Sequence, residues 1–134
     1  MPRAFFDGAE QDGQCGCGVF IVVNENCHYH LFWNGGSGSN IKAEVVALAG
    51  LLHFCLFVNL QDVSIFCDSK VLVDGLRGNN IIRKPQLSGW IDRIILMWKR
   101  SKGVSIRHIK RDLNQAADDL SKKGLRMAPG LWFL

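Results

Sequence analysis

The chain has 134 residues, which leaves room for one domain, because domains usually contain about 100 to 200 residues. Hydrophobic residues make up 48% and charged residues 21%, so the composition excludes a disordered chain and indicates a buried core. The net charge of +4 permits a polyanionic partner without requiring one. We therefore expect one domain over residues 1–134, with a core of about residues 3–124 and a tail over residues 125–134.

The start of the chain does not resemble a secretory signal. The first ten residues contain two acids and no apolar segment of the kind that directs secretion. The longest apolar run, Val45 to Val58, is shorter than the about 20 residues that cross a bilayer, and Gly50 and His53 interrupt it. We expect a buried helix there, no membrane partner, and an intracellular protein, nuclear or cytoplasmic.

The five cysteines indicate a reducing compartment, because their number is odd and three of them lie in apolar segments. Cys15 and Cys17 have the spacing of a metal-binding pair. No second pair of cysteines or histidines with ligand spacing accompanies them, so we do not expect a zinc site.

The first third of the chain predicts three antiparallel strands. The strand-like segments are Arg3–Ala9, Gly16–Val23 and Cys27–Trp33. Residues 24–26 predict a hairpin turn, residues 8–16 a longer loop, and the glycines after Trp33 the end of the third strand.

The rest of the chain alternates helices and strands. We expect helices over Asn40–Val58, Lys70–Leu76, Pro85–Lys102 and Leu113–Gly124, and strands over Val63–Cys67 and Val104–Ile109. Gly78 would end the second helix; Asp112 and Gln115 have capping-box spacing, and Gly124 would be the C-cap of the last helix. Because helices connect the last two strands, those strands should pair in parallel. The prediction is an α/β fold with a five-stranded mixed sheet, three antiparallel strands followed by two parallel ones, flanked by helices.

Four acids lie at the ends of these predicted elements. Asp7 follows two phenylalanines in the first strand, where an unpaired buried charge costs several kcal/mol. Asp68 ends the fourth strand, and ligands gather beyond the carboxyl ends of such strands. Glu44 lies one turn into the first helix, and Asp118 shares a face of the last helix with Asn114. Taken one at a time, these acids also have ordinary explanations. An acid at a strand end often forms a turn, one in the first turn of a helix often interacts with the helix dipole, and one on an amphipathic last helix is often solvated.

Taken together with their flanking residues, these acids lie in motifs that identify a family. The motifs, in chain order, are Phe6–Ala9, Gly13–Gly18, Ser39–Leu48, Asp68–Asp74 and His108–Gly124. The sequence resembles type 1 ribonuclease H from Phe5 to about Gly124, and in particular the shorter ribonuclease-H-like domains of plants and of reverse-transcribing elements. The resemblance implies a ribonuclease-H-like fold and an endonuclease that cleaves the RNA strand of RNA/DNA hybrids.

The resemblance also implies a metal site. Asp7, Glu44, Asp68 and Asp118 match the four acids that hold two magnesium ions in the family, with Mn²⁺ as a substitute. Clustered carboxylates need protons or divalent cations, and two ions can promote in-line phosphodiester hydrolysis. The spacing from Asn114 favours Asp118 over Asp119 as the ligand. His108 matches the family's mobile histidine, which shuttles a proton or helps the product leave.

Further residues match positions that contact the substrate. The nucleic-acid-binding positions implied by the resemblance are Gln14, Ser39, Asn40, Lys70 and Asn114. Asn40 would recognise the RNA strand, whose 2′-hydroxyl distinguishes it from DNA. Ser39 and Gln14 would contact DNA phosphates, and Lys70, which replaces a glutamine, would contact a phosphate.

The chain departs from the bacterial members by lacking their basic, tryptophan-bearing handle between Gly78 and Pro85. Basic residues that either replace it or form a solvated face are Arg77, Arg83, Lys84, Lys99, Arg100 and Lys102. With few phosphate contacts we expect weak, salt-sensitive binding. We interpret Trp90 and Trp98 as packing residues, and His28, His30 and His53 as structural.

Two other functions stay open at this point. One is a catalytically weak or inactive module, derived from a retroelement, that binds nucleic acid or a protein. The other is a related nuclease or nucleotidyl transferase that accepts DNA. We expect a monomer that is either a stand-alone domain or part of a longer polyprotein with a reverse transcriptase.

Overall fold

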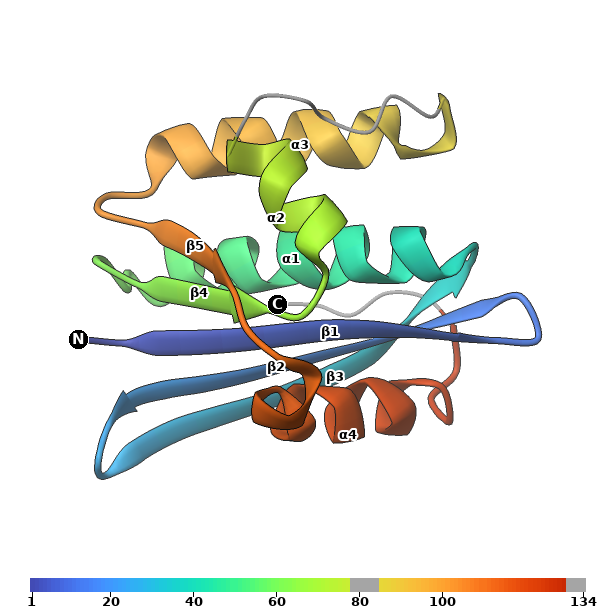
Figure 1. Ribbon diagram of the computed structural model, residues 1–134, viewed down its shortest axis with the longest axis horizontal. Helices are drawn as coiled ribbons and strands as arrows, with labels where there is room; N and C mark the ends of the chain where they lie inside the picture. The colour runs from blue at the N-terminus through green and yellow to red at the C-terminus, as the bar shows by residue number, and fades with distance from the viewer. Residues whose placement is uncertain (78–84, 130–134) are drawn as a thin grey trace.

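The computed structural model describes residues 1–77 and 85–129 and contains a five-stranded sheet with helices on both faces (Figure 1). The strands are β1 (Arg3–Gln11), β2 (Gln14–Asn24), β3 (Cys27–Ser37), β4 (Ser64–Cys67) and β5 (Ser105–His108), in the order β3-β2-β1-β4-β5. β1 to β3 are antiparallel, whereas β4 pairs with β1 and β5 with β4 in parallel. This mixed sheet confirms the predicted architecture.

The first hairpin is tighter than predicted. β1 and β2 are connected by Asp12 and Gly13 alone, and both residues have positive φ angles, 52° and 78°. An Asp-Gly pair with this geometry forms a two-residue turn whose twist matches that of the strands. The longer loop expected over residues 8–16 is therefore wrong, because Glu10 and Gln11 are exposed strand residues.

The second hairpin forms at the predicted place, but β3 is longer than predicted. The Asn24 side chain accepts a hydrogen bond from the Asn26 backbone N–H at 2.8 Å, as in an Asx turn. β3 continues past Trp33 to Ser37, through glycines that were expected to end it. A shift in the pairing register near Gln14 lets this segment remain hydrogen-bonded to β2.

The long helix α1 (Asn40–Phe57) lies on one face of the sheet and supplies much of the core. The Ser39 hydroxyl caps it by accepting a hydrogen bond from the Lys42 N–H at 3.3 Å. In the part of the chain that the structure describes, α1 is also the one helix long and apolar enough to cross a membrane. Of that helix, 67% is buried inside the protein, as is common for core helices.

The remaining helices divide between the two faces of the sheet. α2 (Lys70–Arg77) contacts β5, and α3 (Ser88–Arg100), which follows a 3₁₀ turn at Pro85–Leu87, packs against α1. α4 (Gln115–Gly124) covers the opposite face over β1, β2 and β3. Figure 1 shows the sheet between α1 and α4. The predicted stop at Gly78 lies outside the described residues.

The start and the end of α4 correct two predictions. The capping box is wrong, because Asp112 lies in a 3₁₀ turn and α4 begins after the N-cap Asn114 without a side-chain capping hydrogen bond. Gly124 is the last residue of α4, and the C-cap is Leu125. A Cβ atom at Gly124 would overlap the Trp33 carbonyl oxygen, so this glycine permits close packing of α4 on β3.

The buried cysteines are free thiols within the core. Cys15 and Cys17 face α1, and their Sγ atoms donate to backbone carbonyls of that region at 3.5 Å. Burial raises the pKa of Cys55 and of Cys67 to about 12. These thiols therefore act as small apolar groups, and Cys15 and Cys17 are not among the clustered ligands found in the described residues.

Candidate metal centre

The candidate site lies where β1 and β4 stop pairing. Residues 3–5 of β1 pair with residues 64–66 of β4, and the pairing ends at Phe5 and Phe66. Two residues further on, Asp7 lies in β1 and Asp68 follows the end of β4. The parallel register thus brings these two acids to equivalent positions at the carboxyl end of β4, where ligands gather in such sheets.

Glu44 reaches the same place from α1. Gly8, next to Asp7, lies directly under the helix, and a Cβ atom there would overlap the backbone of Ala43 and Glu44. The absence of a side chain at Gly8 therefore lets α1 approach β1 closely enough to place Glu44 at the site.

Asp7, Glu44 and Asp68 form the one group of three or more potential metal ligands found within residues 1–77 and 85–129. One oxygen of each lies within 4.8 Å of the others. The Asp7 residue is 7% exposed and Glu44 9%, and the Asp68 side chain is 11% exposed. Three carboxylates are thus gathered in a largely dehydrated pocket, where like charges repel strongly.

The electrostatics of Asp7 reflect this crowding. Burial, the charge of Asp68, a hydrogen bond with Asp118 and the charge of Glu44 raise the pKa of Asp7 to about 8, although the Gly8 N–H donates to Asp7 Oδ1 at 2.9 Å. The pocket therefore favours either a proton on Asp7 or a cation beside it, well above the pH at which an ordinary aspartate ionises.

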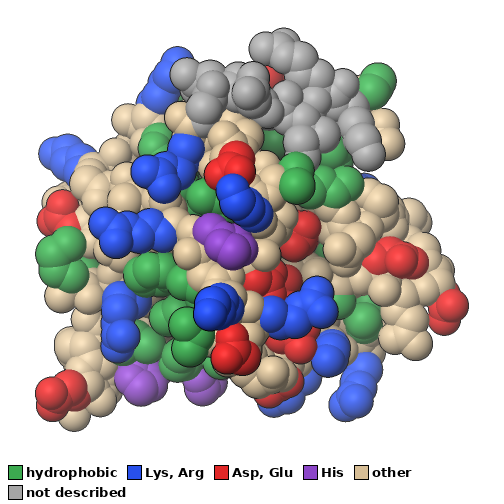
Figure 2. Space-filling model, in the orientation of Figure 1, with side chains coloured by type: hydrophobic (Ala, Val, Ile, Leu, Met, Phe, Trp, Pro, Cys, Tyr) green, Lys and Arg blue, Asp and Glu red, His purple; other side chains and the backbone are tan. Residues whose placement is uncertain are grey.

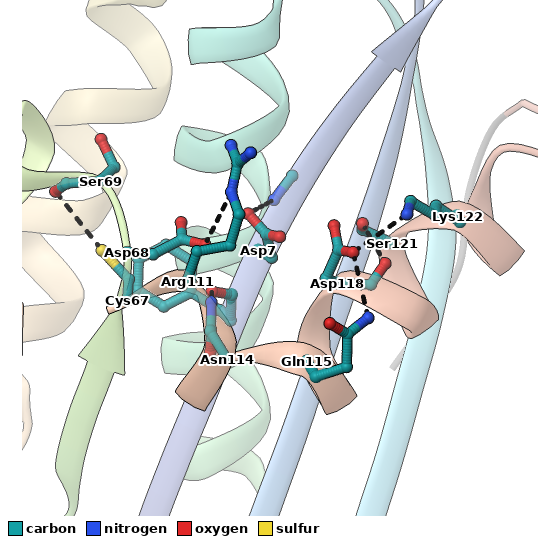
Figure 3. Close-up of polar contacts among 12 residues, drawn as sticks. Asp7, Cys67, Asp68, Ser69, Arg111, Asn114, Gln115, Asp118, Ser121 and Lys122 are labelled. Atoms are coloured by element: carbon teal, nitrogen blue, oxygen red, sulfur yellow. Dashed lines mark hydrogen bonds and ion pairs between the residues drawn. The ribbon is translucent and has the colours of Figure 1, made fainter. Parts of the chain in front are cut away.

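Glu44 is perturbed in the same direction. Burial and the charge of Asp68 raise the pKa of Glu44 to about 7, against the opposing effects of a hydrogen bond with Ser69 and the charge of Arg111. The Arg111 Nε atom lies 4.0 Å from Asp68 Oδ2, and its side chain is 91% exposed (Figure 3). The pair is long and its arginine is solvated, so Arg111 offsets the buried charge only in part and the pKa of Glu44 remains raised. Arg111 and Ser69 were not predicted as site residues.

These shifts predict an unusual pH dependence of stability without metal. Asp7 and Glu44 hold their protons more tightly in the folded chain than in the unfolded chain, where they titrate near 3.8 and 4.5. The free energy of unfolding should therefore fall as the pH rises from about 5 to 8. Urea denaturation in EDTA across this range measures it, and stability that stays constant or rises would contradict the prediction.

Asp118 lies beside this group but is also paired elsewhere. Its carboxylate hydrogen-bonds with Asp7, and Figure 3 shows the two side chains turned toward each other. Asp118 Oδ2 also lies 3.1 Å from Lys122 Nζ and accepts from Gln115 Nε2 at 3.4 Å. The neighbouring Asp119 is exposed and accepts from Gln115 at 2.8 Å. Of the two aspartates, Asp118 is the one that adjoins the pocket.

Asn114 connects the start of α4 to the strand that carries Asp7. Its side-chain Nδ2 donates to the Phe6 carbonyl oxygen at 3.0 Å. Its backbone carbonyl oxygen accepts a hydrogen bond from the Asp118 backbone N–H at 3.1 Å. The residue is 1% exposed, and its role toward nucleic acid stays a prediction. We interpret Asn114 as a positioning residue that holds Asp118 near Asp7.

Replacing Asn114 by alanine should destabilise the fold and loosen α4. The change leaves the buried Phe6 carbonyl without its donor, which costs about 1–3 kcal/mol. Urea denaturation measures this effect. The control is Gln115→Ala at the adjacent exposed position, which should change stability by less than about 0.5 kcal/mol. Equal stability of the two variants would exclude the positioning role.

The other predicted site residues lie around the pocket. His108 is the exposed last residue of β5 and pairs in register with Cys67, directly before Asp68. Asn40 is exposed at the start of α1, one turn before Glu44. Lys70 is exposed at the start of α2 and forms an ion pair with Asp74 at 3.1 Å.

Ser39 and Gln14 lie together at the N-terminal end of α1. Gln14 pairs with Ser37, and the Gly38 N–H donates to the Gly13 carbonyl at 2.8 Å. The Ser39 hydroxyl is already used as the helix cap. Their roles toward nucleic acid stay predictions.

The predicted packing and basic residues are also located. Trp90 and Trp98 are half-buried and pack against the core. Of the six basic residues considered as a replacement for the handle, Arg77, Lys99, Arg100 and Lys102 are exposed, whereas Arg83 and Lys84 lie outside the described residues.

Comparison with known proteins identifies the family of this chain and structures with a similar fold. The model of the reverse transcriptase-like family matches residues 5–124. The chain belongs to the reverse transcriptase-like family. A search of curated proteins found no match for this family member.

Solved structures resemble this reverse transcriptase-like chain in fold. Ribonuclease H1 from the halophilic archaeon Halobacterium salinarum NRC-1 has a TM-score of 0.84 and 24% identity, covering 93% of this chain and 97% of that one. LC11 ribonuclease H1, crystallised with an RNA/DNA hybrid, has a TM-score of 0.81 and 21% identity, covering 94% and 97%.

A viral enzyme of larger size contains the same fold. Prototype foamy virus protease-reverse transcriptase has a TM-score of 0.71 and 18% identity, and the match covers 95% of this chain and 21% of that protein. At such identities these likenesses show the fold. The ribonuclease-H-like fold that the sequence motifs implied is thereby confirmed.

Proposed function

We propose that this family member is a metal-dependent endonuclease that hydrolyses the RNA strand of RNA/DNA hybrids. The buried group of Asp7, Glu44 and Asp68 is the observation that carries this proposal. Its raised pKa values indicate a pocket in which negative charge lacks a counter-charge, as a divalent cation would provide. The similarity in fold to LC11 ribonuclease H1, which was crystallised with a hybrid, supports the choice of substrate.

The donor set fits magnesium, which prefers hard carboxylate oxygens and retains several waters. Asp7, Glu44, Asp68 and Asp118 would hold two Mg²⁺ ions, with Mn²⁺ as a substitute. When bound, such ions activate the attacking water and stabilise the leaving oxygen of the phosphodiester. The ion pair of Asp118 with Lys122 lies on the helix surface and contributes only about 0.3–0.5 kcal/mol, so it holds Asp118 away from the metal only weakly.

Residues around the pocket would position the hybrid. His108, which is exposed and pairs with Cys67 beside Asp68, would give a proton to the leaving oxygen or help the product leave. Asn40, one turn before Glu44, would bind the RNA strand through its 2′-hydroxyl. Gln14 and Lys70 would bind phosphates of the hybrid. Ser39 would contact a phosphate of the DNA strand through its backbone N–H.

The contact between Asp118 and Lys122 also favours a second candidate function. A carboxylate that stays paired with Lys122 leaves three ligands at the pocket, and metal binding would be weaker. The chain would then bind a hybrid with little or no turnover. A cleavage assay separates the two functions.

The assay uses an RNA/DNA hybrid with the RNA strand labelled, in Mg²⁺, Mn²⁺ or EDTA. We expect cleavage of the RNA strand in either metal, none in EDTA, and products with 5′-phosphate and 3′-hydroxyl ends. Asp118→Asn should reduce cleavage, whereas the matched Asp119→Asn, at an exposed position, should not. Binding without cleavage would support the non-catalytic module, and equal cleavage of a DNA duplex would indicate a different nuclease.

A further inference from the structure

A row of aromatic side chains crosses the sheet on the face opposite α1. Strand pairing joins neighbouring members of this row, and the ring centroids of successive pairs lie 5.0, 6.1 and 5.2 Å apart. At the β5 edge the row ends in an arginine that pairs in register with the last ring. The aromatic row therefore consists of His30, Phe20, Phe5, Phe66 and Arg107.

The alternation of side chains places this row outside the main core. Ala4, Phe6 and Val19 point toward α1 and are at most 1% exposed. Phe5 and Phe20 point to the other face and are only half-buried. The aromatic side chains are thus buried on one side by the sheet and by each other, and remain accessible on the outer side.

α4 covers only part of this face. A Cβ atom at Gly16 or Gly18 would overlap the backbone of α4, so the helix lies over that end of β2. Phe20 lies beyond Gly18 along the same strand, past the covered part. Figure 2 shows hydrophobic side chains gathered on this part of the surface, with histidine side chains along their lower edge.

A hollow of about 80 Å³ lies where the aromatic row meets α4. Phe5, Phe20 and the exposed Leu113 line it, together with Asn114. The Asn114 Oδ1 atom is buried and has no hydrogen-bond partner among the described residues. The hollow therefore combines apolar walls with an acceptor that a donor group of a ligand could satisfy.

On the side of the row that faces away from the candidate metal centre, the charges are basic or neutral. The adjacent row, read across the same strands, consists of His28, Val22, Arg3, Ser64 and Ser105. The two rows together contain two arginines, two histidines and no acid. Half-buried rings with flanking cations suit a ligand that offers flat aromatic groups along a polyanionic backbone.

We propose that the aromatic row binds single-stranded nucleic acid. Bases would stack on Phe5, Phe20 and Phe66, and phosphates would pair with Arg3 and Arg107. Stacking of this kind tolerates any base sequence, because every base has a π-face. The arginines of the two rows favour a polyanionic ligand of this kind over a protein partner with a basic surface.

The row lies one step from the candidate metal centre. Asp7 follows Phe5 by two residues on the same face of β1, and Asp68 follows Phe66 in the same way. A strand bound on the row would run beside the pocket. Only this consequence rests on the proposed function, since single-strand binding itself needs no cleavage.

Fluorescence anisotropy with labelled oligouridylate and oligothymidylate of about 12 nucleotides, in EDTA, tests the proposal. The double variant Phe20→Leu and Phe66→Leu keeps the apolar volume and removes the stacking faces. It should weaken binding at least about tenfold. Phe57→Leu, at an exposed phenylalanine on α1 outside the row, should bind as the wild type does.

Arg107→Gln gives a second, independent readout at an exposed position that does not affect folding of the core. It should weaken binding and reduce its dependence on salt. Unchanged binding by this variant and by the double leucine variant would overturn the proposal. So would a wild type that binds neither oligonucleotide, or a dimer in sedimentation that Phe66→Glu dissociates.

The single-strand and cleavage proposals can fail separately. Asp68→Asn should not weaken single-strand binding, because the change removes a negative charge beside the aromatic row and none of its rings or cations. A wild type that binds oligonucleotides but cuts no hybrid would exclude the nuclease alone. A wild type that cuts hybrids but binds no oligonucleotide would exclude the aromatic row alone.

Discussion

Replacing Asp7 by asparagine is expected to stabilise the metal-free protein and to abolish cleavage. Asparagine keeps the acceptor for the Gly8 N–H but carries no charge, so the buried repulsion with Asp68 and Glu44 disappears. At pH 8 in EDTA the variant should gain about 1–3 kcal/mol of unfolding free energy. The change removes one of the proposed metal ligands. Even the loss of a residue that only hydrogen-bonds to a metal ligand lowers metal affinity about 10–100-fold. Cleavage should therefore fall at least about a hundredfold.

Measuring the unfolding free energy with and without Mg²⁺ shows whether Asp7 is a metal ligand or only a residue under electrostatic strain. Mg²⁺ should raise the unfolding free energy of the wild type, because a ligand that binds only the folded state stabilises it. The same addition should leave Asp7→Asn nearly unchanged. The control is Asp92→Asn, at an exposed position on α3, which should behave as the wild type in both measurements. A magnesium response retained by Asp7→Asn would remove this aspartate from the site.

Replacing Gly8 by alanine should have the second largest effect, although it removes no polar group. The new methyl group would overlap the Ala43 and Glu44 backbone, so α1 must move away from β1. Overpacking of this kind costs about 1–3 kcal/mol, and the displacement carries Glu44 away from Asp7. Urea denaturation and hybrid cleavage should both report the loss.

Gly89→Ala is the matched control for this substitution. Gly89 lies in α3, and no atom outside its own helical turn lies within 4 Å of the place that a methyl group would take. Alanine there should be neutral or stabilise the helix by up to about 1 kcal/mol. If Gly8→Ala unfolded at the same urea concentration as the wild type, close packing of α1 on β1 would not be what places Glu44.

The residues of the pocket were predictable to the extent that strand order determines them. Asp7 and Asp68 lie in apolar runs that predict strands, and the parallel pairing of β1 with β4 in the structure aligns them. Glu44 required the family motif, since helix periodicity does not tell which buried residue of α1 faces the pocket. Arg111 and Ser69 contribute through side-chain positions that depend on the packing of distant elements.

The errors arose where local signals compete. The Asp112 pattern suggested a capping box, but Asn114 is drawn into a bond with the Phe6 carbonyl, and the helix starts after it. The polar residues around Asp12 suggested a loop, whereas the twist of a long hairpin favours the two-residue turn. In both cases tertiary contacts decided between conformations that the local sequence allowed.

The short pairing between β4 and β1 affects how easily this edge of the sheet opens locally. β1 pairs with β2 along its whole length, but with β4 over only residues 3–5 and 64–66. The edge formed by β4 and β5 is thus held by few backbone bonds, and short edges open locally at low free energy. A cation held by both Asp68 and Asp7 would connect β4 to β1 and make local opening of this edge less favourable. Its amide hydrogens would then exchange with solvent more slowly, while those of the central hairpin would be little affected.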